Sequence, residues 1–146
     1  MKKIPLTHGK YAIVDNGDFE MLSKFRWYVD KNGYAVCLLR MGRVVLDPQK
    51  EVLVDHINGD RLDNRRSNLR IATYAQNAKN RKINNGNLAG FKGITKHGKG
   101  WRAKIVSDNK RYNLGTFLTK EEAALAYNKA ARKYHGKFAL LNNIKI

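Results

Sequence analysis

Four residues between positions 55 and 77 have the side-chain types that metal-assisted cleavage of a phosphodiester bond requires. They are Asp55, His56, Asn68 and Asn77. A hard divalent cation prefers oxygen ligands, and Mg2+ takes only one or two of them from protein. The Asp55 carboxylate and the Asn77 amide oxygen therefore suit a site for Mg2+, with Mn2+ as an alternative.

The same chemistry needs a base that takes a proton from the attacking water. Histidine is the side chain whose unperturbed pKa lies closest to neutral pH, so His56 is the candidate. A further group must hold the imidazole in one tautomer and orientation. We expect Asn68 to do this by accepting the ring N–H through its amide oxygen.

A strand, a long polar loop and a short helix are predicted to position these side chains. Residues 52–54 form an apolar run typical of a strand, and Thr73-x-x-Gln76 has the form of a helix capping box. Each part also has a simpler interpretation. An Asp-His pair at a strand end is usually structural, residues 58–60 are typical of a turn, and residues 63–64 can hydrogen-bond loop backbone. Residues 65–66, two arginines, would by default be solvated.

The run VDHINGDRLDNRRSNLR, followed by an Asn-bearing helix, resembles the HNH endonucleases of phages and mobile introns, which carry a ββα-metal active site. The resemblance implies that His56 is the general base and that Asn68 orients it. It also implies that Asp55 and Asn77 bind the metal beside the scissile phosphate. Arg81 is either a phosphate-binding residue or the exposed end of the helix.

The net charge of +17 points to a polyanionic partner, because 29 Lys and Arg face only 12 Asp and Glu. Residues 83–146 hold 13 of these basic residues and 3 of the acidic ones. Such a surface gains free energy by releasing counterions from nucleic acid, which makes nucleic acid the first partner to consider and an anionic membrane surface the second. With the motifs below, double-stranded DNA is the partner that we predict.

The sequence has no apolar run as long as a membrane span, and its start lacks the apolar stretch of a signal peptide. We therefore expect no membrane partner and a cytoplasmic location. The single cysteine, Cys37, excludes an intramolecular disulfide and a four-cysteine zinc ribbon, so no structural zinc is predicted.

The N-terminal third is predicted to be a small antiparallel sheet that braces the catalytic loop. Residues 11–14, 27–29 and 34–38 have strand patterns, and Asn32-Gly33 is a hairpin signal between the last two. Residues 15–18 are predicted to form a turn and residues 19–22 one helical turn. Trp27 is expected in the core.

The C-terminal part is predicted to be three strands and one helix. Residues 83–89 are rich in Asn and Gly and indicate a linker. Residues 91–95, 101–106 and 111–117 alternate like strands, and a capping box at Thr119 begins a helix that ends at Gly136. Residues Trp101, Ala103, Ile105, Tyr112 and Leu114 are expected to face the helix.

The opposite sheet face is predicted to bind DNA, where Arg and Lys contact guanine or phosphate and Asn can contact adenine. A merely solvated face is the alternative. The residues assigned to DNA binding are Lys92, Thr95, Lys96, Arg102, Lys104, Arg111 and Asn113.

This part also resembles the AP2 DNA-binding domain of plant transcription factors. The resemblance rests on Trp101-Arg102-Ala103, on residues 114–117 and on residues 121–124. It implies that the sheet enters the major groove. Thr95, Val106 and Asn113 stand where plant members tend to have Arg or Trp, so the plant target sequence does not transfer.

These observations predict an α+β protein in which a small antiparallel sheet and a ββα-metal HNH motif precede a three-stranded antiparallel sheet packed on one helix. The predicted domains are residues 1–82 (nuclease), 83–89 (linker) and 90–146 (AP2-like). The predicted function is a metal-dependent DNA endonuclease of the homing type, nicking or cutting both strands, with a monomer favoured. The alternatives are a DNA-binding transcriptional regulator that retains an inactive nuclease scaffold, and an RNA-binding protein.

Overall fold

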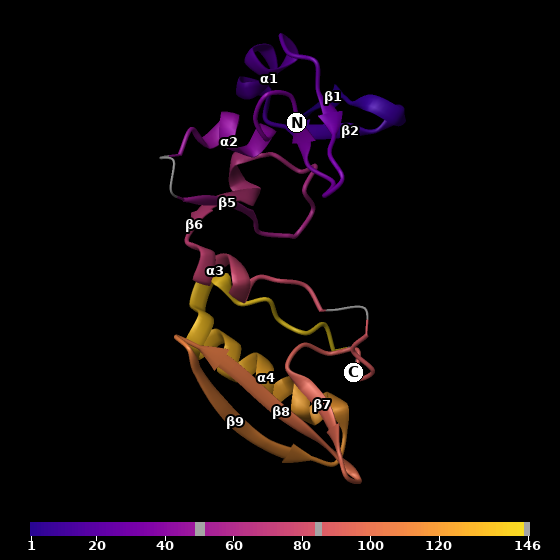
Figure 1. Ribbon diagram of the computed structural model, residues 1–146, viewed down its shortest axis with the longest axis vertical. Coiled ribbons are helices and arrows are strands. Elements are labelled where there is room, and N and C mark those ends of the chain that lie inside the picture. The colour runs from indigo at the N-terminus through magenta and orange to yellow at the C-terminus, as the bar shows by residue number, and fades with distance from the viewer. Residues whose placement is uncertain (49–51, 84–85, 145–146) are drawn as a thin grey trace. The chain divides into compact units, whose positions relative to one another are not determined.

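A computed structural model of the chain describes residues 1–48, 52–83 and 86–144 (Figure 1). The chain divides into two compact units, Met1–Tyr74 and Ala75–Ile146. Each has its own apolar core, and each mixes helices with antiparallel strands, which confirms the predicted α+β class. The predicted domain bounds stay a prediction, and Asn84 and Asn85 of the predicted linker lie outside the described residues.

In its described residues the first unit contains three two-stranded antiparallel sheets and two α-helices. One sheet and one helix lie near the N-terminus: β1 (Lys2–Pro5) pairs with β2 (Tyr11–Val14), and α1 (Asn16–Ser23) follows. A hairpin and a second helix come next: β3 (Tyr28–Val29), β4 (Ala35–Val36) and α2 (Met41–Leu46). The third sheet pairs β5 (Leu53–His56) with β6 (Leu69–Ala72).

Several predictions for this unit are confirmed. The strand at residues 11–14 and the hairpin around Asn32-Gly33 are present, although the hairpin strands are shorter than predicted. Trp27 is buried, and its indole N–H donates to the Leu22 carbonyl at 2.7 Å. Two expectations were wrong or incomplete. Residues 16–18 are the first turn of α1 rather than a separate turn, and α2 was not predicted.

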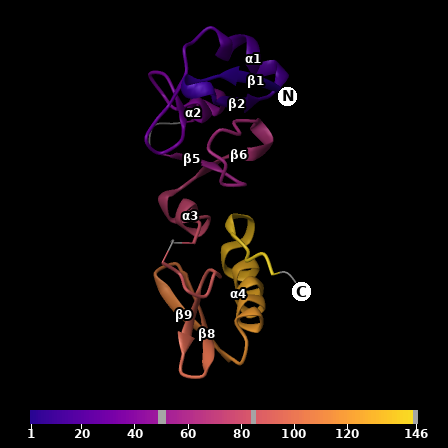
Figure 2. The same cartoon turned by 90° about the vertical axis from the view of Figure 1, so that its right-hand side faces the viewer.

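Helix α3 (Tyr74–Lys79) belongs to the second unit from Ala75 onward. Three strands and α4 (Lys120–His135) follow it. The strands β7 (Ile94–His97), β8 (Gly100–Ser107) and β9 (Lys110–Phe117) form one antiparallel sheet in chain order. Helix α4 runs along one face of this sheet (Figure 2). The module of three strands and one helix is therefore confirmed.

Local sequence explains the ends of these elements. The Thr119 hydroxyl accepts from the Glu122 N–H and the Glu122 carboxylate accepts from the Thr119 N–H, which is the predicted capping box. Between β8 and β9, Asp108 and Asn109 have φ of 50° and 61°, as a two-residue hairpin turn requires. Among the described residues, no helix is long and apolar enough to cross a membrane.

The core of the second unit is formed where the inner sheet face meets α4. Ala103 and Ile105 of β8 are buried, and Tyr112 of β9 stacks on Tyr134 of α4 with ring centroids 4.5 Å apart. Leu114 is partly buried in the same cluster. The predicted inward-facing residues are thus confirmed, and the opposite sheet face is left for other contacts.

Candidate active site and nucleic-acid interface

His56 lies at the end of β5, inside the first unit. Its Nε2 is 3.2 Å from Oδ1 of Asn64, and the two residues are 6% and 1% exposed. The Asn64 amide nitrogen donates to the Leu62 carbonyl at 3.2 Å, so the amide oxygen is the atom directed at the imidazole. An oxygen can only accept, so Nε2 carries the proton and the Nδ1 lone pair is the basic site of the ring.

Burial keeps His56 neutral. Desolvation lowers the pKa of His56 below its usual 6.5, and the hydrogen bond that the ring donates to Asn64 and the charge of Asp55 oppose this effect without cancelling it. The ring of Tyr34 lies 5.7 Å from the imidazole, centroid to centroid, and contributes to its enclosure. A neutral histidine at neutral pH is the form that can accept a proton.

Asn64 is itself held by the rest of the first unit. Its backbone N–H donates to the Ile13 carbonyl at 2.8 Å, and the Ile13 N–H donates to the Leu62 carbonyl at 2.9 Å. A Cβ added at Gly42 of α2 would lie 3.3 Å from Asn64 Oδ1, so α2 packs closely against this amide. Strand β2 and helix α2 therefore fix the residue that contacts His56.

Asp55 precedes His56 on β5 and points to the other side of the strand, where it meets Arg70. Arg70 stands directly opposite on β6 and donates to Asp55 Oδ2 from Nε at 2.8 Å and from Nη2 at 2.6 Å. Both side chains are largely buried, at 8% and 14% exposed. This pairing fixes the direction of the carboxylate, and sequence reasoning did not single out Arg70.

Asn68 ties the two ends of the loop between β5 and β6. Its Oδ1 accepts from the Asn58 N–H at 3.0 Å, and its Nδ2 donates to the Asp63 carbonyl at 2.7 Å. The contact with the imidazole that the sequence predicts for Asn68 is made by Asn64, a residue predicted only to hydrogen-bond loop backbone. The direct role of Asn68 in orienting His56 stays a prediction, while its contacts with the loop backbone are observed.

The arginines at 65 and 66 are both ion-paired, although Arg66 is exposed as the default interpretation expected. Arg65 Nε donates to Oδ1 of the buried Asp63 at 2.7 Å, and this bond is the main cause of a lowered Asp63 pKa. Arg66 binds both carboxylate oxygens of Asp18 on α1. Both arginines therefore anchor the loop because each has a buried carboxylate within reach.

The metal ligands Asp55 and Asn77 stay a prediction, and their oxygen atoms are the donor type that Mg2+ prefers. Among the described residues no three His, Cys, Asp or Glu side chains gather as a cation site. Mg2+ needs no such group, because waters and phosphate oxygens complete its shell. Asp55 supplies a fixed carboxylate in the first unit. Asn77, the second predicted ligand, lies half-buried on α3 in the second unit, and Arg81 follows that helix.

The outward face of the second unit's sheet carries most of the residues predicted to bind DNA. Arg102 stands between Thr95 of β7 and Thr116 of β9. Lys104 lies opposite Asn113, and Val106 lies opposite Arg111. A bulge at Ala103 and Lys104 shifts the register of β9, which brings Thr116 into the row. Simple alternation along β9 could not have identified Thr116.

Lys92 and Lys96 were also predicted to lie on the outward face, and the structure corrects their positions. Lys96 stands directly opposite Trp101, and its ammonium lies 4.7 Å from the centre of that ring, on the side of the strand away from Thr95. Lys92 precedes β7, and its ammonium donates to the carbonyls of Lys79 and Arg81 at 2.7 Å each. Neither lysine shares the outward face with Arg102.

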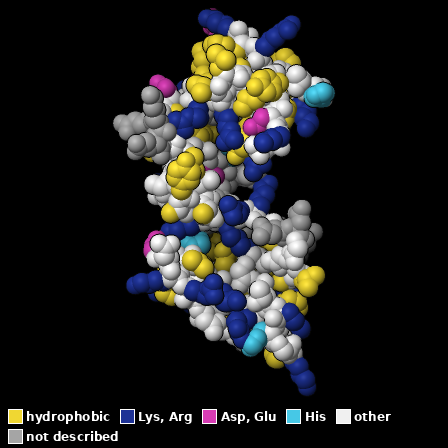
Figure 3. Space-filling model, in the orientation of Figure 1, with side chains coloured by type: hydrophobic (Ala, Val, Ile, Leu, Met, Phe, Trp, Pro, Cys, Tyr) yellow, Lys and Arg dark blue, Asp and Glu magenta, His cyan; other side chains and the backbone are white. Residues whose placement is uncertain are grey.

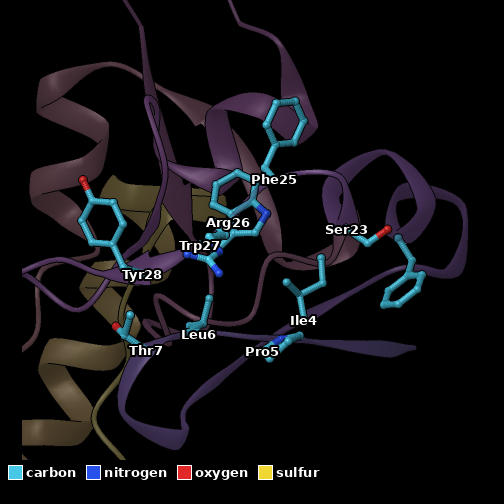
Figure 4. A pocket seen from close by; sticks show the side chains of 10 residues that line it. Ile4, Pro5, Leu6, Thr7, Ser23, Phe25, Arg26, Trp27 and Tyr28 are labelled. Atoms are coloured by element: carbon cyan, nitrogen blue, oxygen red, sulfur yellow. The ribbon is translucent and has the colours of Figure 1, made fainter.

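The first unit also contains an apolar pocket of about 540 Å³, shown in Figure 4. Side chains of Ile4, Leu6, Phe25 and Trp27 line it, and Arg26 contributes a charge. The residues that line it do not include those predicted to act in catalysis. Lys and Arg side chains recur over the face of the molecule in Figure 3.

Two antiparallel strands with Asp-His at the end of the first, an Asn-rich loop and a following helix have the form of a ββα nuclease site. The profile of the family described as HNH endonuclease matches residues 47–79, which include both Asp55 and Asn77. An uncharacterized HNH endonuclease of Acanthamoeba polyphaga mimivirus is 31% identical over 150 residues, which cover 93% of this chain and 76% of the relative. The chain belongs to the HNH endonuclease family.

Two further similarities cover parts of the chain. Protein 3.8 of Escherichia phage T7 is 33% identical over 92 residues, 62% of this chain and 75% of the relative. An AP2-like ethylene-responsive transcription factor of Oryza sativa is 48% identical over 56 residues, 36% of this chain and 9% of that protein, in the C-terminal region. No solved structure matches the chain significantly.

Proposed function

We propose that the protein is a metal-dependent endonuclease of the homing type that hydrolyses double-stranded DNA, targeted by its AP2-like sheet. The observation that carries the proposal is the buried contact between His56 Nε2 and Asn64 Oδ1 at 3.2 Å, next to Asp55. It orients the imidazole with its proton on Nε2, at the strand end where the resemblance to HNH endonucleases implies a general base.

In this proposal His56 takes the proton of the attacking water on Nδ1. Asn64 keeps the proton on Nε2, which leaves Nδ1 as the basic nitrogen of the ring. Asn68 holds the loop ends together and thereby keeps His56 and Asn64 in register. The lowered pKa of His56 ensures that the neutral form is present at neutral pH.

Asp55 and Asn77 are the proposed metal ligands, Mg2+ being the preferred ion and Mn2+ an alternative. A bound divalent cation would polarise the scissile phosphate and stabilise the leaving oxygen. Arg70 holds the Asp55 carboxylate in one direction before any substrate arrives. Arg81 is the proposed phosphate-binding residue.

The outward sheet face is the proposed DNA-recognition surface. Arg102, Lys104 and Arg111 supply positive charge there, and Thr95, Asn113 and Thr116 supply hydrogen-bonding groups. The similarity to AP2-like transcription factors supports this role. A regulator with an inactive nuclease scaffold would use the same face, so binding alone does not distinguish the two functions.

Incubation of the purified protein with supercoiled plasmid DNA, in Mg2+ or in chelator, tests the proposal. We expect conversion to open-circular or linear DNA in Mg2+ alone, and the product separates nicking from cutting of both strands. Salt-sensitive binding without cleavage, on DNA that contains the protein's own target, would favour the regulator. Preferential binding of RNA would favour an RNA-binding protein.

A further inference from the structure

The second unit contains a hollow of about 670 Å³ between the end of α3 and the start of β7. Four cationic residues line it: Arg81, Lys82, Lys92 and Lys96. Its apolar walls include Ile83 and Leu88, and Leu88 is 96% exposed. Among the described lining residues there is no Asp or Glu. The hollow is therefore cationic and partly apolar.

Lys92 brings the two sides of this hollow together. Its ammonium donates to the carbonyls of Lys79 and Arg81, at the carboxyl end of α3, where helix carbonyls lack intrahelical partners. The Lys92 backbone is in turn fixed by the Asn142 side chain, which accepts from its N–H at 2.6 Å. Arg81 and Lys82 on one side, and Lys96 on the other, consequently face a common space.

The positively charged side chains in the hollow repel one another. Burial, together with the positive charge of Arg81, lowers the pKa of Lys92 to about 8. The Lys92 ammonium satisfies the last carbonyl of α3 and that of Arg81, whereas the side chains of Arg81, Lys82 and Lys96 are exposed. An anion placed among these side chains would relieve their repulsion and gain from counterion release.

We propose that this hollow seats the sugar-phosphate backbone of duplex DNA. The inference rests on the proposed function and adds a contact surface that shares Thr95 with the outward sheet face. The cations match backbone phosphates, and the exposed apolar side chain of Leu88 matches the carbon atoms of deoxyribose. A free phosphate ion would use the cations alone. Lys96, which is absent from the outward face, thus belongs to a second DNA contact, and Lys92 holds the two sides of that contact together.

The test is the salt dependence of binding to a 30-base-pair duplex by the full chain. Each phosphate contact contributes about 0.9 to the slope of log K against log salt. We expect Lys82→Gln and Lys96→Gln each to lower the slope by about that amount, and the double variant by about 2. The matched control is Lys129→Gln with Lys133→Gln, which removes the same charge from the exposed side of α4 and should leave the slope nearly unchanged.

An unchanged slope in the Lys82→Gln variant, or an equal loss in the α4 control, would overturn the hollow as a DNA seat. Lysine acetylation with and without duplex gives a second measurement. We expect DNA to protect Lys82 and Lys96 and to leave Lys129 and Lys133 reactive, and uniform protection would contradict the proposal. Failure of the wild-type protein to bind duplex at all would instead contradict the proposed function.

Discussion

The imidazole of His56 and the amide of Asn64 form a buried pair, with Nε2 and Oδ1 3.2 Å apart, that fixes which ring nitrogen can accept a proton. The pair joins the end of β5 to the loop that follows it. Through the backbone of Asn64 it is also tied to β2. The proposed base is thus oriented by a part of the chain that precedes the family-matched segment.

Substitutions of Asn64 should move the pH dependence of cleavage in opposite directions. Since the pKa of His56 is lowered from 6.5, the wild-type rate should stay high through pH 6.5 and fall only at lower pH. Asn64→Asp adds a negative charge that favours the imidazolium, so its acid limb should move to higher pH. Asn64→Leu removes a bond that raises the pKa and should move it lower. The measurement is the cleavage rate between pH 5 and 8.

Identical acid limbs in the three proteins would contradict the assignment of Asn64 as the positioning residue. The pH dependence of stability checks independently that the pKa of His56 is lowered. A histidine whose pKa is lower in the folded protein than in the unfolded one contributes stability that is complete above the pKa of the unfolded state. This stability is lost as the pH falls through the pKa of the folded state. The wild-type protein should therefore lose thermal stability below pH 6.5, and His56→Ala should lose less over that range.

Removal of Arg70 should destabilise the first unit. Arg70→Met leaves the buried Asp55 carboxylate without its guanidinium partner, and breaking a buried pair in this way costs roughly 3 kcal/mol. We expect Asp55→Asn combined with Arg70→Met to recover part of the loss, because the buried charge is then gone. Denaturant unfolding of the wild type and these two variants measures this. A double variant less stable than Arg70→Met would show that the pair is not the cause.

Removal of charge from the outward sheet face should weaken DNA binding. Arg102→Gln with Arg111→Gln removes two cations from β8 and β9, so the slope of log K against log salt should fall by about 2. Fluorescence anisotropy with labelled duplex at several salt concentrations measures it. The double substitution of Lys129 and Lys133 on α4 is the control, and equal losses in both would eliminate the sheet as the recognition face.

Gly93→Ala should unfold much of the second unit, because its Cβ would lie 2.3 Å from the Tyr127 ring and 2.6 Å from the Lys104 carbonyl oxygen. The φ of 78° adds backbone strain, and together these effects cost roughly 2–5 kcal/mol. Gly98→Ala is the matched control, with a φ of 56° and no heavy atom within 4 Å of its Cβ. Similar thermal unfolding of the two variants would contradict the close packing at Gly93.

Sequence patterns were sufficient for the order of elements in the second unit, because alternation and a capping box are local signals. Its β-bulge depends on register between strands, so the position of Thr116 could not be read from β9 alone. Similarly, the side of the strand on which Lys96 lies depends on where β7 begins. The sequence analysis predicted Lys96 on the outward face, whereas its pairing with Trp101 shows that it lies on the opposite face.

In the first unit the residue types of the site were recognisable, but their partners were not. Asp55 and His56 were identified from their types and from the motif around them. The contacts of Asn64 with His56 and of Arg70 with Asp55 depend on how the loop folds back and how β6 pairs with β5. The role of α2 was also missed, because its buried residues Met41 and Val45 are contacts made only in the folded unit.

The most direct test of the central claim compares wild-type protein and His56→Ala on supercoiled DNA in Mg2+, with duplex binding measured in parallel. Loss of a general base typically slows a reaction by 100-fold or more. We therefore predict that His56→Ala loses cleavage by at least about this factor while its DNA affinity stays within about twofold of wild type. Cleavage by His56→Ala at the wild-type rate would contradict the assignment of His56 as the base.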